Sequence, residues 1–183
     1  MPMQPDPTFT ELTTERLSLR RSLPGDAAAI SRYRSDPDVH VHQGWGHTDP
    51  DTVRTDIEEM TTRAPGTPGG WVQFSVLRRD DGVLVGDVGL SPAEGEPKVI
   101  KVGYTMAPEH QGQGYATEAV EALVGYAFEV LAADIVRAYA GADNAPSIRI
   151  MEKVGMRLME RFEGEEDGER WTGVRYERSR PTT

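Results

Sequence analysis

The stretch of residues 99–124 constrains the fold and the chemistry of this chain more than any other. An apolar segment, VIKVGYTM, leads through a short connector into Q-G-Q-G-Y-A, and a long amphipathic segment follows. Gly112 and Gly114 can adopt backbone angles that other residues resist, and they place no side chains in the way. Successive amide groups can then converge on an anion at a helix N-terminus, where the helix dipole favours negative charge. The segment therefore predicts a phosphate-binding loop between a strand and a helix.

The spacing of the glycines argues against two common phosphate ligands. A dinucleotide fingerprint needs G-x-G-x-x-G or a final alanine, and the residues after Gly114 are one position out of register. An ATP-binding loop needs Gly-Lys followed by Ser or Thr, which is missing here. The pattern that fits is Q-x-x-G-x-A, read on Gln111, Gly114 and Ala116. A tight turn before a helix is the alternative interpretation of the same residues.

A second motif narrows the choice. From Asn144 the chain reads N-A-P-S-I-R-I-M-E-K-V-G-M, which predicts a short helix ended by Gly155 in a left-handed conformation. The two motifs, in this order and at this distance, resemble the GNAT superfamily of N-acetyltransferases, whose Q-x-x-G-x-A loop binds the pyrophosphate of acyl-CoA. Three further segments resemble the branch that acetylates the N-termini of ribosomal proteins: T-T-E-R-L-S-L-R at 13–20, D-P-D-V at 36–39 and V-G-D-V-G-L at 85–90. The resemblance covers nearly the whole chain.

Length and composition predict a single soluble domain. With 183 residues and 37% hydrophobic residues, the chain can bury a substantial core. We expect a flexible tail at 1–10, one domain at 11–178 and a C-terminal tail at 179–183. The longest apolar region is interrupted by Glu121, Glu129 and Asp134, so no segment approaches the roughly 20 residues of a membrane span. Because residues 1–10 have no basic start followed by an apolar run, we expect a cytoplasmic protein.

Charge and cysteine content exclude several classes of function. The net charge of −10 argues against a nucleic-acid-binding surface, which needs a basic stripe. The lack of cysteine removes disulfide bonds and a thiol nucleophile. Five carboxylates crowd residues 163–169. They would attract a cationic amine if this segment borders the acceptor site, and otherwise they serve solubility.

Periodicity and turn residues place the elements. Strands are predicted at 17–20, 71–77, 83–90, 99–106 and 135–140, with a closing hairpin of 156–162 and 171–176 and the acidic loop at its tip. Helices are predicted from Asp26 to a stop at Asp36-Pro37, after the capping signal at 48–50, after the glycine loop and after Asn144. The predicted fold class is α/β (α+β), a GNAT-like mixed and mostly antiparallel sheet of about six to seven strands with helices on both faces.

The resemblance implies direct transfer of an acetyl group from acetyl-CoA to a primary amine in a ternary complex, without a metal. It also implies that the glycine loop holds the pyrophosphate through its main chain, and that a splayed strand before the loop offers main-chain groups to the pantetheine and the thioester. Tyr104 and Met106 could equally be core residues, and Asn144 a helix cap. The predicted donor-binding residues are Tyr104, Thr105, Met106, Gln111, Gly112, Gln113, Gly114, Tyr115, Ala116, Thr117, Asn144 and Ser147.

The catalytic groups depart from the family pattern. Many GNAT enzymes have a tyrosine acid at the position matched by Met151, which has no proton to give. The leaving thiolate is then left to Ser147, to water or to no group, and Ser147 matches a serine that hydrogen-bonds the CoA sulfur in the ribosomal-protein branch. An acidic residue that often precedes the G-Y of the strand is replaced by Lys101.

Several candidates for the base follow. We select Glu163, with Glu165 and Asp87 as alternatives, although each of these fits a solvated surface charge as well. A histidine acting through water is a further choice, because His40, His42 and His47 lie where the family shapes the acceptor pocket. Trp45, in the same segment, either lines that pocket or anchors the loop.

The sequence leaves the acceptor open among a protein N-terminus, an aminoglycoside-like antibiotic, a polyamine and a small metabolite. A non-catalytic acyl-CoA-binding or regulatory module of the same fold is the alternative, and Lys101 and Met151 favour it. A homodimer is compatible with the resemblance. Neither a nucleic acid nor a membrane is expected as a partner.

Overall fold

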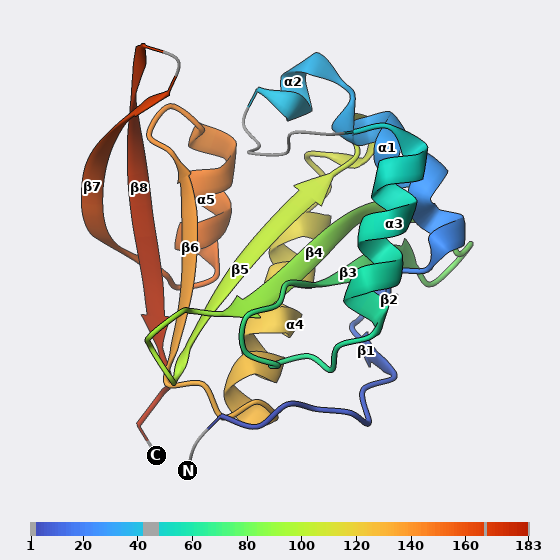
Figure 1. The fold of residues 1–183 in the computed structure, drawn as a ribbon, viewed down its shortest axis with the longest axis horizontal. Helices are drawn as coiled ribbons and strands as arrows, with labels where there is room; N and C mark the ends of the chain where they lie inside the picture. The colour runs from blue at the N-terminus through green and yellow to red at the C-terminus, as the bar shows by residue number, and fades with distance from the viewer. Residues whose placement is uncertain (1–2, 42–47, 167, 183) are drawn as a thin grey trace.

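The computed structural model describes residues 3–41, 48–166 and 168–182. It contains one eight-stranded sheet with helices on both faces (Figure 1). The strand order is β1-β2-β3-β4-β5-β6-β8-β7, and every neighbouring pair is antiparallel except β5 and β6, which are parallel. The mixed and mostly antiparallel sheet predicted from the sequence is confirmed.

The strands are β1 (Glu11–Thr13), β2 (Leu17–Arg21), β3 (Val72–Arg78), β4 (Leu84–Pro92), β5 (Val99–Met106), β6 (Ile135–Gly141), β7 (Arg157–Glu166) and β8 (Glu169–Ser179). The helices are α1 (Ala27–Arg34), α2 (Pro37–His40), α3 (Pro50–Thr61), α4 (Tyr115–Glu129) and α5 (Ala145–Lys153). Two short 3₁₀ turns precede α1 and α4, η1 (Pro24–Asp26) and η2 (Pro108–His110).

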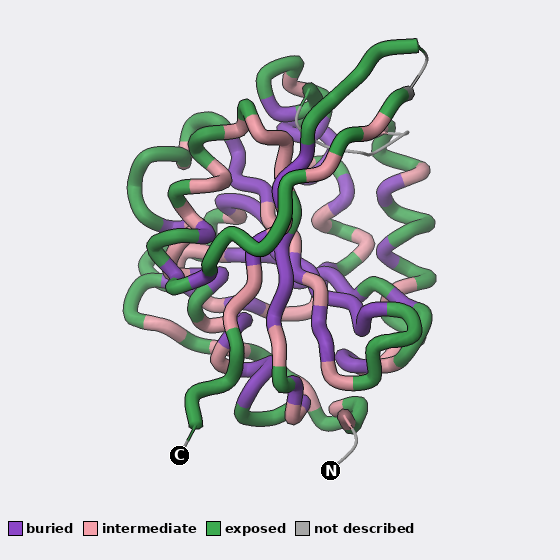
Figure 2. Tube along the Cα trace, turned by 90° about the vertical axis from the view of Figure 1, so that its left-hand side faces the viewer, coloured by how far each residue is buried: buried purple, intermediate pink, exposed green. Residues whose placement is uncertain are grey.

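Side chains that alternate along the strands bury both faces of the sheet. In β4, Val88 belongs to the main core, which also contains Leu123 of α4. The neighbouring Asp87 points to the other face, where Tyr33 of α1 donates a hydrogen bond to its carboxylate. Because a strand buried on both faces lacks a solvated side, β4 is buried over nearly its whole length. Figure 2 shows the buried residues gathered on the central strands.

The helix starts follow from their capping residues. The Asp49 carboxylate accepts a hydrogen bond of 2.9 Å from the Thr52 amide, and Pro50 occupies the first turn of α3, as the capping signal predicts. Asp36-Pro37 ends α1 as expected, but it also begins α2, since the Asp36 side chain accepts from the Asp38 amide at 3.0 Å. The predicted stop therefore acts as a second start.

Two features of the sheet differ from the prediction. The sheet has eight strands rather than six to seven, because Glu11–Thr13 pairs with β2 as a three-residue edge strand that is too short to show periodicity. Most of the acidic segment is strand rather than loop. Glu163, Glu165 and Glu166 lie in β7 and Glu169 lies in β8, so four of the five carboxylates belong to the strands of the hairpin.

The chain ends are tied to the domain more than the expected tails suggest. Tyr126 of α4 donates a hydrogen bond of 2.9 Å to the Asp6 carboxylate, and the ring of Phe9 packs edge-on against Phe74 at 5.0 Å. At the other end, Ser179 is still part of β8 and pairs with Ile135. Within the described residues no helix combines the length and the apolar character needed to cross a membrane.

Candidate active site

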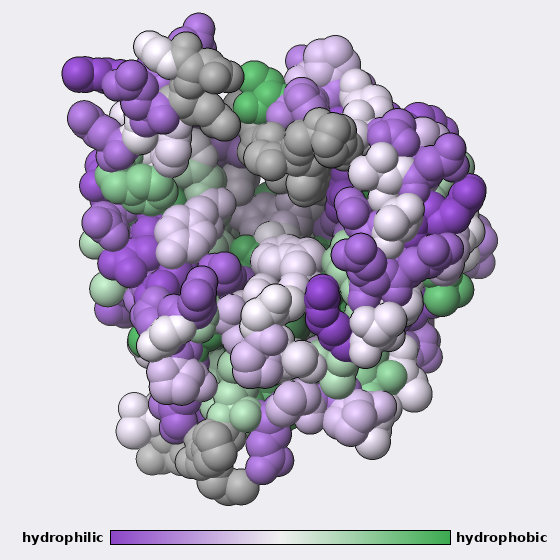
Figure 3. Space-filling view, in the orientation of Figure 1, coloured by the Kyte–Doolittle hydropathy of each residue, from purple (hydrophilic) through white to green (hydrophobic). Residues whose placement is uncertain are grey.

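The site begins where two parallel strands separate. β5 and β6 pair only through Val99–Ile135, Ile100–Val136 and Lys101–Arg137. Beyond Lys101, β5 continues along β4 as far as Met106, while β6 continues along β8 as far as Gly141. The two strands therefore diverge like the sides of a wedge (Figure 1), and the molecular surface is hollowed between the two halves of the sheet (Figure 3). The splay that the resemblance implies is confirmed by this register.

The glycine loop closes one side of the wedge. Gly112 and Gly114 have φ angles of 73° and 81°, in the left-handed region that the sequence predicts for a loop of this kind. Gly114 is the N-cap of α4, so the free amide groups of the first helical turn face the loop. The Gln111 side chain donates a hydrogen bond of 3.1 Å to the Met106 carbonyl and ties the loop to the end of β5.

Helix α5 forms the opposite side. The Asn144 side-chain oxygen accepts a hydrogen bond of 3.1 Å from the Ser147 amide and caps the helix. The capping interpretation of Asn144 is therefore confirmed, and because the oxygen makes this bond, the amide nitrogen is left for a ligand in the cavity that Asn144 lines. Gly155 has a φ angle of 77° just after α5, as the motif predicts.

The two sides enclose a cavity of about 410 Å³. Of the predicted donor-binding residues, Tyr104, Thr105, Met106, Gln111, Gly112, Gly114, Tyr115, Ala116, Thr117, Asn144 and Ser147 all line it. Gln113 does not, because its carbonyl accepts a hydrogen bond of 2.9 Å from Arg16 and its side chain bends back to the Glu109 carbonyl.

Sequence reasoning missed other residues on the cavity wall. Asp38 and Val39 reach it from α2, and His110 reaches it from η2. Pro146, Arg149, Ile150 and Lys153 add a continuous face of α5. The positions of these four residues could have predicted this face, because residues three or four apart lie on the same side of a helix.

Tyr104 and Ser147 meet across the wedge. The Tyr104 hydroxyl lies 2.8 Å from the Ser147 hydroxyl and donates to the Ser147 carbonyl at 3.0 Å. Burial raises the pKa of Tyr104 to about 12, and the hydrogen bond with Ser147 opposes this only in part. The phenol therefore stays protonated at neutral pH and can donate a hydrogen bond into the site. The sequence predicted only main-chain contacts or a place in the core for Tyr104, and no role for its hydroxyl.

The other catalytic candidates lie elsewhere. Met151 is fully buried in the core. Glu163 is exposed on β7 opposite Thr172 and does not line the cavity. Asp87 is buried beneath α1, where Tyr33 and Arg34 donate to its carboxylate.

His40 is exposed in α2, whereas His42, Trp45 and His47 lie outside the described residues. In the part of the chain that the structure describes, no group of three potential metal ligands is found.

Comparisons with known proteins identify the family. A family model for the acetyltransferase (GNAT) domain matches residues 16–157. The chain belongs to the GNAT acetyltransferase family. It is 30% identical over 146 residues to the uncharacterized N-acetyltransferase YnaD of Bacillus subtilis, and the match covers 80% of this chain and 82% of that protein.

Solved structures of GNAT proteins have the same fold. A GNAT-family acetyltransferase from Bacillus anthracis has a TM-score of 0.81 and 27% identity, and the match covers 93% of this chain and 98% of the other. RimL, a ribosomal L7/L12 alpha-N-protein acetyltransferase in complex with coenzyme A, has a TM-score of 0.79 at 15% identity, with 92% and 97% covered. The GNAT chain described here is thus an N-acetyltransferase, and its family transfers acetyl groups from acetyl-CoA to amines.

Proposed function

We propose that this GNAT protein binds acetyl-CoA in the cavity between β5 and α5 and passes the acetyl group directly to a primary amine in a ternary complex. One observation carries the proposal: residues from two sequence motifs, about the glycine loop and about Asn144, line one cavity at the point where β5 and β6 separate. RimL, which has this fold, is described with coenzyme A bound, and this supports the same donor here.

Different parts of the cavity bind the donor and stabilise the reacting groups. Amide groups of the glycine loop and the N-terminus of α4 hold the pyrophosphate. The edge of β5 beyond Lys101, which has no strand partner in β6, offers main-chain groups to the pantetheine and to the thioester oxygen as it becomes negative. Ser147 donates its hydroxyl hydrogen to the departing thiolate, and the Tyr104 hydroxyl then turns its own hydrogen from the Ser147 carbonyl to the Ser147 hydroxyl oxygen.

The choice of acceptor depends on how easily its amine loses a proton, because no base is assigned in the site. Glu163, the base selected from the sequence, stays a prediction. Among the described residues, Asp38 of α2 and His110 of η2 are titratable groups that line the cavity on that side. At a pH of about 7.5 an α-amine with a pKa of ~8 is about one quarter unprotonated, whereas a lysine with a pKa of ~10.4 is only ~0.1% unprotonated. We therefore propose an α-amine, such as a protein N-terminus, as the acceptor class.

Calorimetric titration with CoA tests the donor site. Gly114→Asp places a carboxylate at the N-cap of α4, in a left-handed conformation that suits glycine, and should abolish binding through repulsion of the phosphates. Gly82→Asp is the matched control. Gly82 has a φ of 71° and open space where a β-carbon would be added, but it lies in the β3–β4 turn. Equal CoA affinity in wild type and Gly114→Asp would contradict the site.

Thiol release over an amine panel tests the reaction. The panel contains a peptide with a free α-amine, the same peptide with an acetylated α-amine and a free lysine, and spermidine. We expect turnover with the first peptide at pH 7 and a steeper rise with pH for the lysine peptide. A preference for spermidine would reassign the acceptor to cationic small molecules, for which the acidic strands β7 and β8 are the supporting feature.

A non-catalytic CoA-binding module is the second candidate. It is favoured by the burial of Met151, which leaves the family's acid position without a function. CoA binding without amine-dependent thiol release from acetyl-CoA, over the whole panel, would favour the module. A homodimer and a cytoplasmic location stay predictions, and light scattering of the purified protein tests the first.

A further inference from the structure

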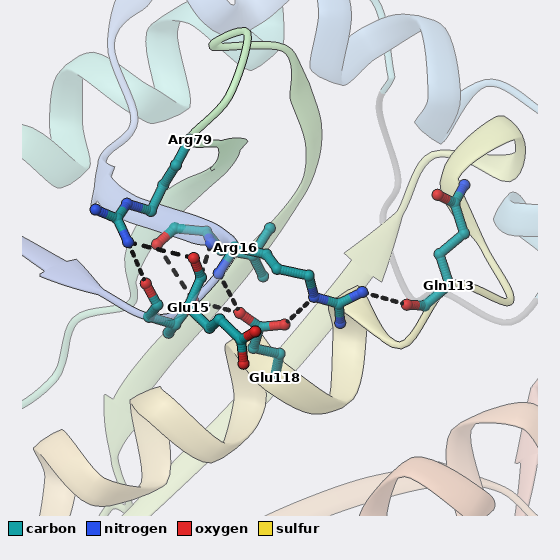
Figure 4. A network of polar contacts seen from close by, with 7 residues as sticks. Glu15, Arg16, Arg79, Gln113 and Glu118 are labelled. Carbon is teal, nitrogen blue, oxygen red and sulfur yellow. Dashed lines mark hydrogen bonds and ion pairs between the residues drawn. The ribbon is translucent and has the colours of Figure 1, made fainter.

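The turn between β1 and β2 is fastened to the glycine loop by one arginine and one glutamate (Figure 4). The Arg16 guanidinium donates through Nη1 to the Gln113 carbonyl at 2.9 Å and through Nε to Glu118 at 2.6 Å. The other oxygen of the Glu118 carboxylate accepts from the Arg16 amide at 2.8 Å and from the Thr14 hydroxyl at 2.6 Å. Residues about 100 positions apart in the sequence are thus joined at the start of α4.

The contact to Gln113 sets the direction of a peptide group in the loop. A trans peptide is planar, and its carbonyl and its amide hydrogen point in opposite directions. When Arg16 holds the Gln113 carbonyl, the amide hydrogen of Gly114 must point away from Arg16. Gly114 lines the cavity, so this amide is one of the donors that the proposed pyrophosphate site requires.

The surroundings of Arg16 limit its freedom further. Its guanidinium carbon lies 4.8 Å from the centre of the Tyr115 ring, a cation–π distance. A side chain at position 114 would place its β-carbon 3.2 Å from Nη2 of Arg16, so the glycine provides space for the guanidinium as well as a left-handed backbone. The planar guanidinium makes two directed bonds beside the Tyr115 ring, a geometry that the ammonium of a lysine does not reproduce.

We propose that Arg16 and Glu118 form a latch that holds the glycine loop in its phosphate-binding conformation. The latch consists of these two side chains together with the Gln113 carbonyl and the Thr14 hydroxyl. Arg16 is a positioning residue in this proposal, which rests on the proposed function because it needs a CoA phosphate as the ligand of the loop. It gives a role to the T-T-E-R-L segment at 13–17, which the donor site did not otherwise use.

A simple charge effect is the competing explanation, and it predicts the opposite result for one variant. If Arg16 only supplied positive charge, Arg16→Lys would bind CoA normally, and Glu118→Gln would bind it more tightly because a negative charge near the phosphates is gone. A latch predicts weaker binding in both variants. The double variant Arg16→Lys/Glu118→Gln should then lose about as much as one single variant, since the two residues act as a unit.

The test is calorimetric titration of wild type and variants with CoA. We expect Kd to rise about tenfold in Arg16→Lys and in Glu118→Gln, the loss of one charge-assisted hydrogen bond. KM for acetyl-CoA should rise by a similar factor while kcat at saturation changes less than about twofold, because the latch does not touch the reacting atoms. Thermal unfolding of each variant shows that the fold is kept.

Arg79→Lys is the matched control. Arg79 holds the same turn by donating to the Thr14 and Glu15 carbonyls at 2.9 and 3.2 Å, but it has no bond to the glycine loop. Its CoA affinity should equal that of wild type. A parallel titration with 3′-dephospho-CoA separates the phosphates: the loss in Arg16→Lys should persist, because the pyrophosphate is common to both ligands.

The outcomes are distinct. Unchanged CoA binding in Arg16→Lys, tighter binding in Glu118→Gln, or a loss that disappears with 3′-dephospho-CoA overturns the latch and leaves the proposed function standing. A wild-type protein that binds no CoA overturns the proposed function and the latch with it. Weaker binding in both single variants, without additivity, supports the latch.

Discussion

Replacing Ser147 by alanine should separate the chemical step from donor binding. The substitution removes a hydroxyl that lies 2.8 Å from the Tyr104 hydroxyl. Tyr104 keeps its second acceptor, the Ser147 carbonyl at 3.0 Å, so no buried donor is left without a partner. The cost in stability is that of one neutral hydrogen bond, about 1 kcal/mol.

The cost in rate should be larger. The thioester sulfur carries little charge in the ground state and becomes a thiolate as the acetyl group leaves. A hydrogen bond to a charged group contributes about 1.5–3 kcal/mol, which corresponds to a fall of about ten- to a hundredfold in kcat. KM for acetyl-CoA should change less than about threefold, because the lost interaction belongs to the transition state.

Tyr104→Phe tests the support that Ser147 receives. Burial holds the pKa of Tyr104 at about 12, well above the ~8.5 of an ordinary thiol, so the phenol donates a hydrogen bond and does not give up its proton. We expect kcat to fall about tenfold. The pH–rate profile between pH 6 and 9 should keep its shape, because the phenol does not titrate in this range.

Single-turnover measurements of thiol release at saturating amine are the assay, because slow product release could hide an effect on chemistry. The double variant Ser147→Ala/Tyr104→Phe should be about as slow as Ser147→Ala alone. Ser35→Ala, at the exposed end of α1, is the control for the substitution itself. A single-turnover rate in Ser147→Ala within about twofold of wild type would remove Ser147 from the mechanism, and additive losses would contradict the coupling.

Three further predictions concern the frame of the site. Arg137→Met should lower the free energy of unfolding by about 1.5–3 kcal/mol in urea titrations, because the largely buried Glu177 loses its 2.7 Å partner and keeps only the longer ion pair of 3.5 Å to Arg175, and a loss below 1 kcal/mol would contradict this. Met151→Tyr should destabilise the protein by about 1–3 kcal/mol through overpacking without raising kcat, whereas a faster enzyme would show that position 151 reaches the site. Burial alone would raise the pKa of Asp26, but hydrogen bonds from Arg20 and its neighbours prevail and lower it. Its stabilisation is therefore present above the unfolded pKa of ~3.9 and is lost as pH falls through the folded value. Asp26→Asn should cost more stability at pH 7 than at pH 2.5, and equal losses would refute the assignment.

Elements with strong local signals were predictable from the sequence. The strand β5 has the predicted bounds, 99–106, because apolar β-branched residues fill it and a proline follows it closely. Helix α3 starts where its aspartate cap and proline indicate. The edge strand β1 was missed because three residues carry no period, and its pairing depends on β2.

The donor site was predictable where the main chain makes it. Glycines that need positive φ angles and a capping asparagine act through local backbone geometry, which a short motif specifies. The contact between Tyr104 and Ser147 was not predictable, because the two residues are 43 positions apart and meet only through the splay of the strands. The position of Asp38 on the cavity wall was not predictable for the same reason, because α2 reaches the cavity only through tertiary packing.

The position of the cavity follows from how the strands share their partners. β6 pairs with β8 along its whole length, from Ile135 to Gly141, and β5 pairs with β4 from Ile100 to Met106. Each strand is therefore held by its other neighbour, and the parallel contact between them cannot continue once the two directions differ. Arg137 lies at the last parallel pair and binds Glu96 at 2.6 Å and Glu177 at 2.7 Å, which joins the β4–β5 connection, β6 and β8 at one point. β5 and β6 can separate only beyond these ion pairs of Arg137. The cavity therefore begins next to Tyr104, where Ser147 lies on the opposite side.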